Sequence, residues 1–218
     1  MRTPSKTLDY IRGLYAPEDA LLREINQTLD ERQVSWQIGA EEGKLLQLLL
    51  KLHGAKTVVE VGTLGGYSAI WMARALPENG HVYTCEKNPE HAELARGFIA
   101  RSDVASMITV LEGDAHEQLK GLADKGYKDT FDAMVIDAEK SGYNAYLDWA
   151  EENIREGGLI IADNTLLFGS VYADEPPKSH GKNTWEAMKL FNQRLADSAK
   201  FDALLIPTEE GLSVAVKR

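Results

Sequence analysis

Residues 57–85 read TVVEVGTLGGYSAIWMARALPENGHVYTC, and their pattern decides the fold. The apolar run 57–61 predicts a buried strand, and the run 81–85 predicts a second one. Between them a glycine-rich turn leads into a helix. One face of that helix carries an apolar stripe at helical spacing, formed by Ala69, Met72, Ala73 and Leu76. A strand, a helix and a second strand in this order are typical of parallel strands joined by a crossover helix.

The same alternation continues through the rest of the chain. Further strands are expected at 108–113, 131–138, 159–164, 201–207 and 211–218, and further helices at 89–101, 115–126, 143–154 and 184–199. Gly157 and Gly158 are expected to end the helix 143–154, and the last two strands predict an antiparallel hairpin. The fold class predicted is therefore α/β, a mostly parallel sheet with helices on both faces. Such sheets bind ligands at the carboxyl ends of their strands.

Composition limits the kind of protein this can be. No apolar run reaches the roughly 18–20 residues that a membrane span needs, and the N-terminus lacks the apolar core of a secretory signal. The single cysteine, Cys85, cannot form an internal disulfide. These features predict a cytoplasmic protein with no membrane partner. The net charge of -10 makes nucleic acid an unexpected partner, because neutralising phosphates requires a basic surface.

The first strand ends in a turn that only superficially resembles a dinucleotide fingerprint. The pattern G-x-G-x-x-G would need glycine at position 64, where Leu64 stands. Glu60 would repel a pyrophosphate but suits a ligand with an ammonium group. The glycines Gly62, Gly65 and Gly66 would let a ligand approach the backbone closely. S-adenosylmethionine fits these features, because it carries an ammonium and a sulfonium and no phosphate.

The next two strand ends support the same cofactor. Glu86 lies about 20 residues beyond the glycine turn, where a carboxylate binds ribose hydroxyls in nucleoside-binding folds. The third strand ends in the residues Asp114, Ala115 and His116, where an adenine edge would lie. Glu86 taken alone could equally be a solvated loop charge, but the successive strand ends together favour S-adenosylmethionine.

Polar side chains also follow the fourth and fifth strands. Asp137 ends one apolar run, and Asp163 and Asn164 end the next. If these strands pair, about 4.8 Å apart, the three side chains can converge. An all-oxygen set favours Mg²⁺ or Ca²⁺ over zinc, and it would leave about three octahedral positions for water and substrate.

Lys140 follows Asp137 by three residues and has two possible roles. A nearby divalent cation and partial burial would both disfavour its ammonium form, and a neutral lysine could take a proton from a substrate hydroxyl. The alternative is that Lys140 simply pairs with Asp137 or Glu139 at the surface.

At this point the sequence resembles a known family. The stretches VVEVGTLGGYSAIWMARAL (58–76), VIDAEKSGY (135–143) and GGLIIADNTL (157–166) together are similar to the metal-dependent O-methyltransferases of the catechol and caffeoyl-CoA type. The similarity runs from about residue 36 to the C-terminus. It implies a Rossmann-like, seven-stranded fold, a homodimer, and methyl transfer from S-adenosylmethionine to one oxygen of a small aromatic vicinal diol. We therefore expect one methyltransferase domain over 1–218, in which the helices of 1–53 form a cap or dimer element and 54–218 form the catalytic core.

The resemblance also assigns roles to individual residues. It implies Asp137, Asp163 and Asn164 as ligands of Mg²⁺ (or Ca²⁺ or Mn²⁺), and Lys140 as the catalytic base. The cofactor contacts that it implies are Ile38, Glu60, Gly62, Thr63, Ser68, Glu86, Ala115, Asp137 and Glu139. Ile38 departs from the family pattern, which has a small hydroxylic residue there. Phe168 departs too, so the acceptor pocket of the plant enzymes cannot be carried over.

Three other functions fit the sequence less well. A tRNA hydroxyuridine O-methyltransferase on the same scaffold would need a basic surface, which the net charge disfavours. A non-catalytic adenosylmethionine-binding protein would not need Asp137, Lys140, Asp163 and Asn164 together. A nicotinamide-dependent oxidoreductase is disfavoured by Leu64 and Glu60. The expectation is a small-molecule O-methyltransferase.

Overall fold

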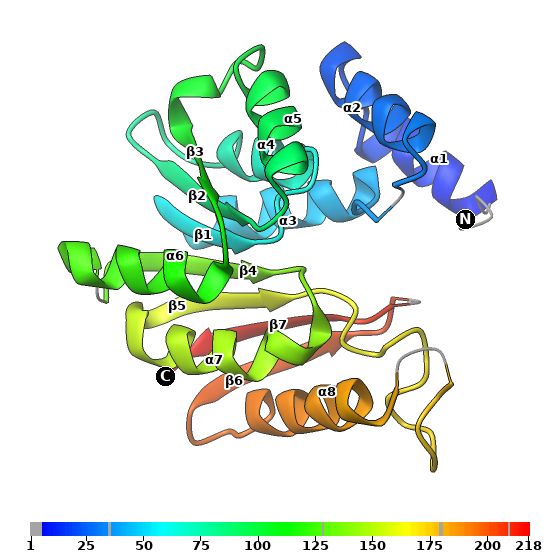
Figure 1. The fold of residues 1–218 in the computed structure, drawn as a ribbon, viewed down its shortest axis with the longest axis vertical. Helices are drawn as coiled ribbons and strands as arrows, with labels where there is room; N and C mark the ends of the chain where they lie inside the picture. The colour runs from blue at the N-terminus through cyan, green and yellow to red at the C-terminus, as the bar shows by residue number, and fades with distance from the viewer. Residues whose placement is uncertain (1–5, 35, 128, 179–180, 209) are drawn as a thin grey trace. The chain divides into compact units, whose positions relative to one another are not determined.

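A computed structural model describes residues 6–34, 36–127, 129–178, 181–208 and 210–218. Seven strands form a mixed sheet, and the elements follow the predicted alternation of strands and helices along the chain (Figure 1). The chain divides into two compact units. Unit 1 comprises Met1–Lys56 and Thr63–Asp114, and unit 2 comprises Thr57–Gly62 and Ala115–Arg218.

Unit 1 is mainly helical. Its elements are α1 (Lys6–Tyr15), α2 (Ala20–Glu31), α3 (Ala40–His53), α4 (Tyr67–Ala73), β2 (His81–Glu86), α5 (Pro89–Ile99), the short turn η1 (Ala105–Met107) and β3 (Ile108–Glu112). Strands β2 and β3 pair in parallel, in a register that runs from Val82↔Ile108 to Glu86↔Glu112. The helices predicted within residues 1–53 are present as α1, α2 and α3, and α3 packs on α4.

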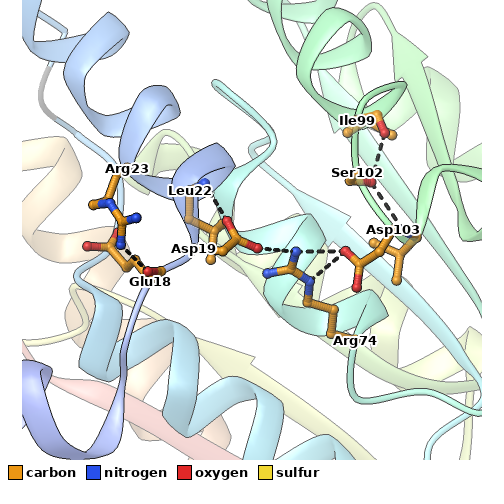
Figure 2. A network of polar contacts seen from close by, with 9 residues as sticks. Glu18, Asp19, Leu22, Arg23, Arg74, Ile99, Ser102 and Asp103 are labelled. Carbon is orange, nitrogen blue, oxygen red and sulfur yellow. Dashed lines mark hydrogen bonds and ion pairs between the residues drawn. The ribbon is translucent and has the colours of Figure 1, made fainter.

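A polar network fastens the start of α2 to the rest of unit 1 (Figure 2). Asp19 caps α2, because its carboxylate accepts a hydrogen bond from the Leu22 backbone N–H at 2.9 Å. The same side chain pairs with Arg74, which follows α4. Arg74 also donates to Asp103 at 2.7 and 2.8 Å. This network is called the Arg74 network below.

Unit 2 contains most of the sheet. Its elements are β1 (Thr57–Val61), α6 (Ala115–Leu122), η2 (Ala123–Tyr127), β4 (Phe131–Ile136), η3 (Lys140–Gly142), α7 (Tyr143–Asn153), β5 (Ile154–Ala162), α8 (Gly181–Leu195), β6 (Phe201–Ile206) and β7 (Leu212–Lys217). The strand order is β1-β4-β5-β7-β6. β1, β4 and β5 are parallel, whereas β7 is antiparallel to both β5 and β6. The predicted parallel strands and terminal hairpin are confirmed.

The middle strands of unit 2 are almost wholly apolar because they are buried. Every residue of β4 except Asp132 is buried, and so are the last five residues of β5. α7 packs on both strands and α8 packs beside α7 (Figure 1). Arg194 of α8 joins the two helices through Asp148 and Glu151, at 2.6 and 2.8 Å.

The prediction that Gly157 and Gly158 end the helix 143–154 is wrong. α7 ends at Asn153, and Gly157 and Gly158 lie inside β5. They form a bulge there: Phe131 pairs with Ile154, whereas Ala133 pairs with Leu159, so β5 carries extra residues. Gly157 has a φ of 74°, a conformation that favours glycine.

Two expectations about the whole chain remain predictions. The single domain with residues 1–53 as an appendage is one, and the homodimer is the other. In the part of the chain that the structure describes, none of the helices has the length and apolar character needed to cross a bilayer.

Candidate functional site

Two parallel strands of unit 2 end at the same level, and each is followed by an aspartate. Ile136 of β4 pairs with Ala162 of β5. Just beyond them, the Asp137 N–H donates to the Val61 carbonyl at 2.9 Å, and the Asp163 N–H donates to the Ile136 carbonyl at 3.0 Å. The predicted neighbourhood of Asp137 and Asp163 therefore follows directly from the sheet register.

Lys140 lies in the short turn η3 and points back to this strand end. Its Nζ donates to the Tyr143 hydroxyl at 2.8 Å and to Asp137 Oδ1 at 3.3 Å. The side chain is largely buried, with 16% of its surface exposed. The predicted pairing with Asp137 is present, but the buried phenol as second partner distinguishes Lys140 from an ordinary surface charge.

Tyr143 links the lysine to the neighbouring strand. It is wholly buried at the start of α7, and its hydroxyl lies 2.9 Å from the Asp163 carbonyl and 3.3 Å from that of Ile136. Burial, reinforced by the charges of Asp137 and Asp163, raises the pKa of Tyr143 well above its usual value. The phenol therefore stays protonated, so it can donate to a backbone carbonyl while it accepts from Lys140.

Asn164 has a constrained backbone and a well-defined amide. Its φ is 56°, in the left-handed region that asparagine tolerates better than most residues. Its N–H donates to Asp163 Oδ1 at 2.7 Å, and its Nδ2 donates to Asp163 Oδ2 at 3.1 Å. Nδ2 also donates to Glu210 Oε2. We call Asp137, Lys140, Tyr143, Asp163, Asn164 and Glu210 the strand-end cluster.

The chemistry of this cluster fits an oxygen-binding divalent cation. Among the described residues, no three histidine, cysteine, aspartate or glutamate side chains form a group that could hold a metal ion. The predicted set has only two carboxylates, Asp137 and Asp163, with the amide oxygen of Asn164 as a third donor. Carboxylate and amide oxygens are what Mg²⁺ and Ca²⁺ prefer, and a site of three protein ligands leaves positions for water and substrate.

Two of the predicted cofactor residues lie at the end of β1 in unit 2. Glu60 is a buried carboxylate, 1% exposed. Gly62 has a φ of 104°, and a Cβ there would lie 2.0 Å from the Asp137 carbonyl oxygen. Only glycine allows the chain to pass so close to the start of the 137–140 segment.

The predicted cofactor residues of unit 1 lie around the end of β2. Glu86 accepts from the backbone N–H groups of Leu64 and Asn88, both at 2.8 Å. The Thr63 hydroxyl bonds to that of Thr84 at 2.5 Å. Glu86 is thus held rigidly against the glycine turn, which a freely solvated loop charge would not be.

Two glycines of that turn, Gly65 and Gly66, also have a role in packing. A Cβ at Gly65 would lie 3.0 Å from Ile25 Cγ2, and a Cβ at Gly66 would lie 3.1 Å from Ile99 Cδ1. Gly66 also begins α4 with a φ of 79°. Both glycines are therefore needed for close packing against α2 and α5, apart from any ligand.

The family model for O-methyltransferases matches residues 14–218. The chain belongs to the O-methyltransferase family. It is 36% identical over 210 residues to a catechol O-methyltransferase of Niastella koreensis, covering 95% of this chain and 94% of that protein. It is 32% identical to caffeoyl-CoA O-methyltransferase 1 of Eucalyptus globulus, covering 93% and 83%.

Solved structures show the same relationship. The O-methyltransferase of Bacillus cereus, in complex with SAH, superposes with a TM-score of 0.87 at 31% identity, covering 96% of both chains. TomG of Streptomyces achromogenes, in complex with SAM, gives 0.88 at 32% identity, covering 96% and 94%. The predicted fold class and enzyme class of this O-methyltransferase are confirmed.

The structure places the predicted site residues of this O-methyltransferase as follows. Within unit 2, hydrogen bonds bring together Asp137, Lys140, Asp163 and Asn164. Glu139 follows the same strand but is exposed and accepts from the Tyr146 hydroxyl at 2.6 Å, and Ala115 begins α6. In unit 1, Ile38 is buried just before α3, and Ser68 lies in the first turn of α4.

Sequence reasoning missed two members of the cluster. Tyr143 stands three residues after Lys140, one helical turn away, and that spacing could have indicated a contact. Glu210 gives no such signal, because it follows a hairpin turn 46 residues away from Asn164. Only the antiparallel pairing of β5 with β7 brings it to the strand end.

Proposed function

We propose that this chain is an S-adenosylmethionine- and divalent-metal-dependent O-methyltransferase that acts on a small aromatic vicinal diol. One observation carries the proposal. Lys140, largely buried, is held by Tyr143 and Asp137 at the strand end where Asp163 and Asn164 also lie. A base placed among oxygen donors suits removal of a proton from a hydroxyl group.

The proposed cofactor residues are those predicted from the sequence. They are Glu60, Gly62, Ala115, Asp137 and Glu139 in unit 2, and Ile38, Thr63, Ser68 and Glu86 in unit 1. Solved relatives of this family in complex with SAM and SAH support the choice of cofactor. The buried carboxylate of Glu60 suits the ammonium group, and the fixed carboxylate of Glu86 suits ribose hydroxyls.

The proposed metal ligands are Asp137, Asp163 and Asn164, and Mg²⁺, Ca²⁺ and Mn²⁺ all suit this oxygen set. When bound, a divalent cation supplies Lewis-acid polarisation of substrate oxygen and orients the diol. The names of the catechol and caffeoyl-CoA relatives support a vicinal diol as acceptor.

Lys140 is the proposed catalytic base. Bound S-adenosylmethionine would supply the methyl group to the substrate oxygen, and its sulfur would keep the electron pair of the broken sulfur–carbon bond. The hydroxyl proton passes to Lys140 Nζ. Tyr143 and Asp137 hold that nitrogen in place, so much of the rate enhancement would come from alignment of the reacting groups.

The test is methyl transfer from labelled S-adenosylmethionine to a panel of catechols and caffeoyl esters, with Mg²⁺ or with EDTA. We expect turnover that requires the metal and falls by about 10²–10⁴-fold in Lys140→Ala. Lys200→Ala is the matched control, because this unit 2 lysine pairs with Glu151 on the surface, 2.6 Å away. Turnover that persists in EDTA, or in Lys140→Ala, would contradict the proposal.

We also propose that the enzyme is a homodimer that uses its N-terminal helices. α1 buries none of its residues and exposes Tyr10, Leu14 and Tyr15, and large exposed apolar side chains that lie together mark interaction surfaces. Light scattering after size exclusion should give twice the chain mass of 24.2 kDa. A monomer at micromolar concentration would contradict this part.

A further inference from the structure

We infer that Glu210 is a positioning residue that fixes the orientation of the Asn164 side-chain amide, so that its oxygen is presented to the metal site. The inference rests on the metal dependence proposed above. Glu210 belongs neither to the predicted ligands nor to the predicted cofactor contacts. It acts on the site through Asn164.

The hydrogen bonds of the Asn164 amide determine its orientation. A side-chain amide has two N–H donors on nitrogen and one acceptor oxygen. Nδ2 donates to Asp163 Oδ2 at 3.1 Å and to Glu210 Oε2. Both donors are therefore directed at carboxylates, which leaves Oδ1 as the atom of the amide that can bind a cation.

The opposite orientation of the amide would be unfavourable. Rotation by 180° would place Oδ1 against the carboxylates of Asp163 and Glu210 and would remove two charge-assisted hydrogen bonds. Such bonds are stronger than hydrogen bonds between neutral groups. Without the Glu210 carboxylate, the same rotation would remove only the bond to Asp163. Glu210 therefore increases the free-energy difference between the two orientations of the Asn164 amide.

The backbone holds Glu210 in place independently of its side chain. The Leu166 N–H donates to the Glu210 carbonyl at 2.8 Å, and the Thr165 N–H donates to the Gly211 carbonyl at 2.9 Å. Gly211 has a φ of 80°, and a Cβ there would lie 2.5 Å from Leu166 Cγ. The segment after Asn164 and the segment before β7 are thus fixed to each other at close range.

Burial adds a second argument. Glu210 is 5% exposed, and burying a carboxylate is costly unless its oxygens are well bonded. A neutral glutamine or a small apolar residue would fill this position at a lower cost. A carboxylate that faces the amide of a proposed metal ligand suits the outer-shell role of orienting that ligand.

The experiment measures binding of Mn²⁺ alone by electron paramagnetic resonance, together with thermal unfolding. Glu210→Ala removes the acceptor, so we expect Mn²⁺ affinity to fall about 10–100-fold. Glu210→Gln keeps an acceptor oxygen in reach of Nδ2, so it should recover most of the affinity. This recovery would separate positioning through a hydrogen bond from an effect of charge or of direct ligation.

Ser213→Ala is the matched control. Ser213 lies on β7 and bonds to Thr165 Oγ1 at 2.8 Å, next to Asn164 but without contact with its amide. We expect its Mn²⁺ affinity to stay within about threefold of the wild type, since neither partner of Nδ2 changes. An equal fall for Ser213→Ala would show that general loosening of the loop is responsible and would overturn the inference.

Two further outcomes separate this inference from the proposed function. If the wild type and Glu210→Ala bind Mn²⁺ equally, Glu210 has no positioning role, while the metal-dependent function stands. If the wild type binds no Mn²⁺, the metal-dependent function fails and the inference fails with it. If Glu210→Ala does not fold, Glu210→Met decides, because it fills the position without an acceptor oxygen: a fall of about 10-fold or more beside near-wild-type affinity of Glu210→Gln supports the inference, and near-wild-type affinity of Glu210→Met overturns it.

Discussion

The Arg74 network of unit 1 and the strand-end cluster of unit 2 both combine carboxylates with a basic side chain, yet they differ in charge balance. In the first, the Arg74 guanidinium forms ion pairs with both Asp19 and Asp103. The other carboxylate oxygen of Asp19 accepts the capping hydrogen bond from the Leu22 N–H. In the second, Lys140 donates to Asp137, whereas Asp163 and Glu210 both accept hydrogen bonds from the neutral side-chain amide of Asn164.

The difference separates stability from function. The Arg74 network joins α2 to the region after α4 and α5, and its charged groups are rich in strong hydrogen bonds. The cluster gathers the carboxylates of Asp137, Asp163 and Glu210 at one strand end, an arrangement that a bound cation would stabilise. Changes to the first should therefore alter unfolding, and changes to the second should alter turnover.

Asp137→Asn should have the largest effect. It removes a charged oxygen from the proposed metal site and the ion-pair partner of Lys140. We expect turnover to fall by roughly three orders of magnitude, because metal-assisted stabilisation is worth several kcal/mol. Thermal unfolding of the metal-free protein should change little, because the lost ion pair with Lys140 offsets the weaker repulsion within the cluster. A lower melting temperature with normal turnover would remove the distinction between the two regions.

Tyr143→Phe should have the next largest effect and should act on both properties. The hydroxyl that holds Lys140 and contacts the Asp163 carbonyl is lost, so we expect about 1–2 kcal/mol lower stability. Turnover should fall about 10-fold as Lys140 loses a fixed partner. Urea unfolding and initial rates measure the two effects.

The control for this change is Tyr146→Phe. Tyr146 lies on the same helix, is equally buried, and its hydroxyl donates to Glu139 at 2.6 Å, whereas the hydroxyl of Tyr143 accepts from Lys140. We expect a similar fall in stability with a smaller fall in turnover. Equal falls in turnover would mean that Tyr143 has no special relation to the lysine.

Arg74→Met should change stability alone, by about 1–2 kcal/mol, because two carboxylates lose hydrogen bonds to a charged donor. Turnover per folded molecule should stay the same. Arg96→Met is the control, since the Arg96 side chain is more exposed than that of Arg74, 46% against 19%, and its pair with Glu112 should contribute at most about 0.5 kcal/mol. A large loss of turnover in Arg74→Met would give the network a functional role.

Asp19→Asn should have the smallest effect, and this effect should depend on pH. Burial by itself would raise the pKa of Asp19, but the hydrogen bonds from Leu22 and Arg74 outweigh it and lower the pKa. A lowered pKa in the folded state means stability that is present above the unfolded value of about 3.9 and is lost as the pH falls below it. The advantage of wild type over Asp19→Asn, about 0.5 kcal/mol at pH 7, should shrink in urea unfolding at pH 3.

The sequence was sufficient to predict the sheet and four of the six residues of the cluster. Asp137 and Asp163 each follow an apolar strand, and parallel strands bring such residues to one edge, so their neighbourhood needs only local patterns. Gly157 and Gly158 misled the prediction because paired glycines serve both helix ends and bulges. Glu210 could not be predicted, since its place depends on which strand β7 pairs with and in which register.

The glycine bulge in β5 has a consequence for how the enzyme can vary. It lies between the end of α7 and the paired residues Ile136 and Ala162. This pair places Asp137 and Asp163, which follow it directly, at the same height in the sheet. Extra residues upstream are absorbed there, and the pairing resumes in register from Ala133 and Leu159 onward. Small insertions or deletions near residue 156 would therefore be tolerated without displacing Asp137 or Asp163 from the strand ends.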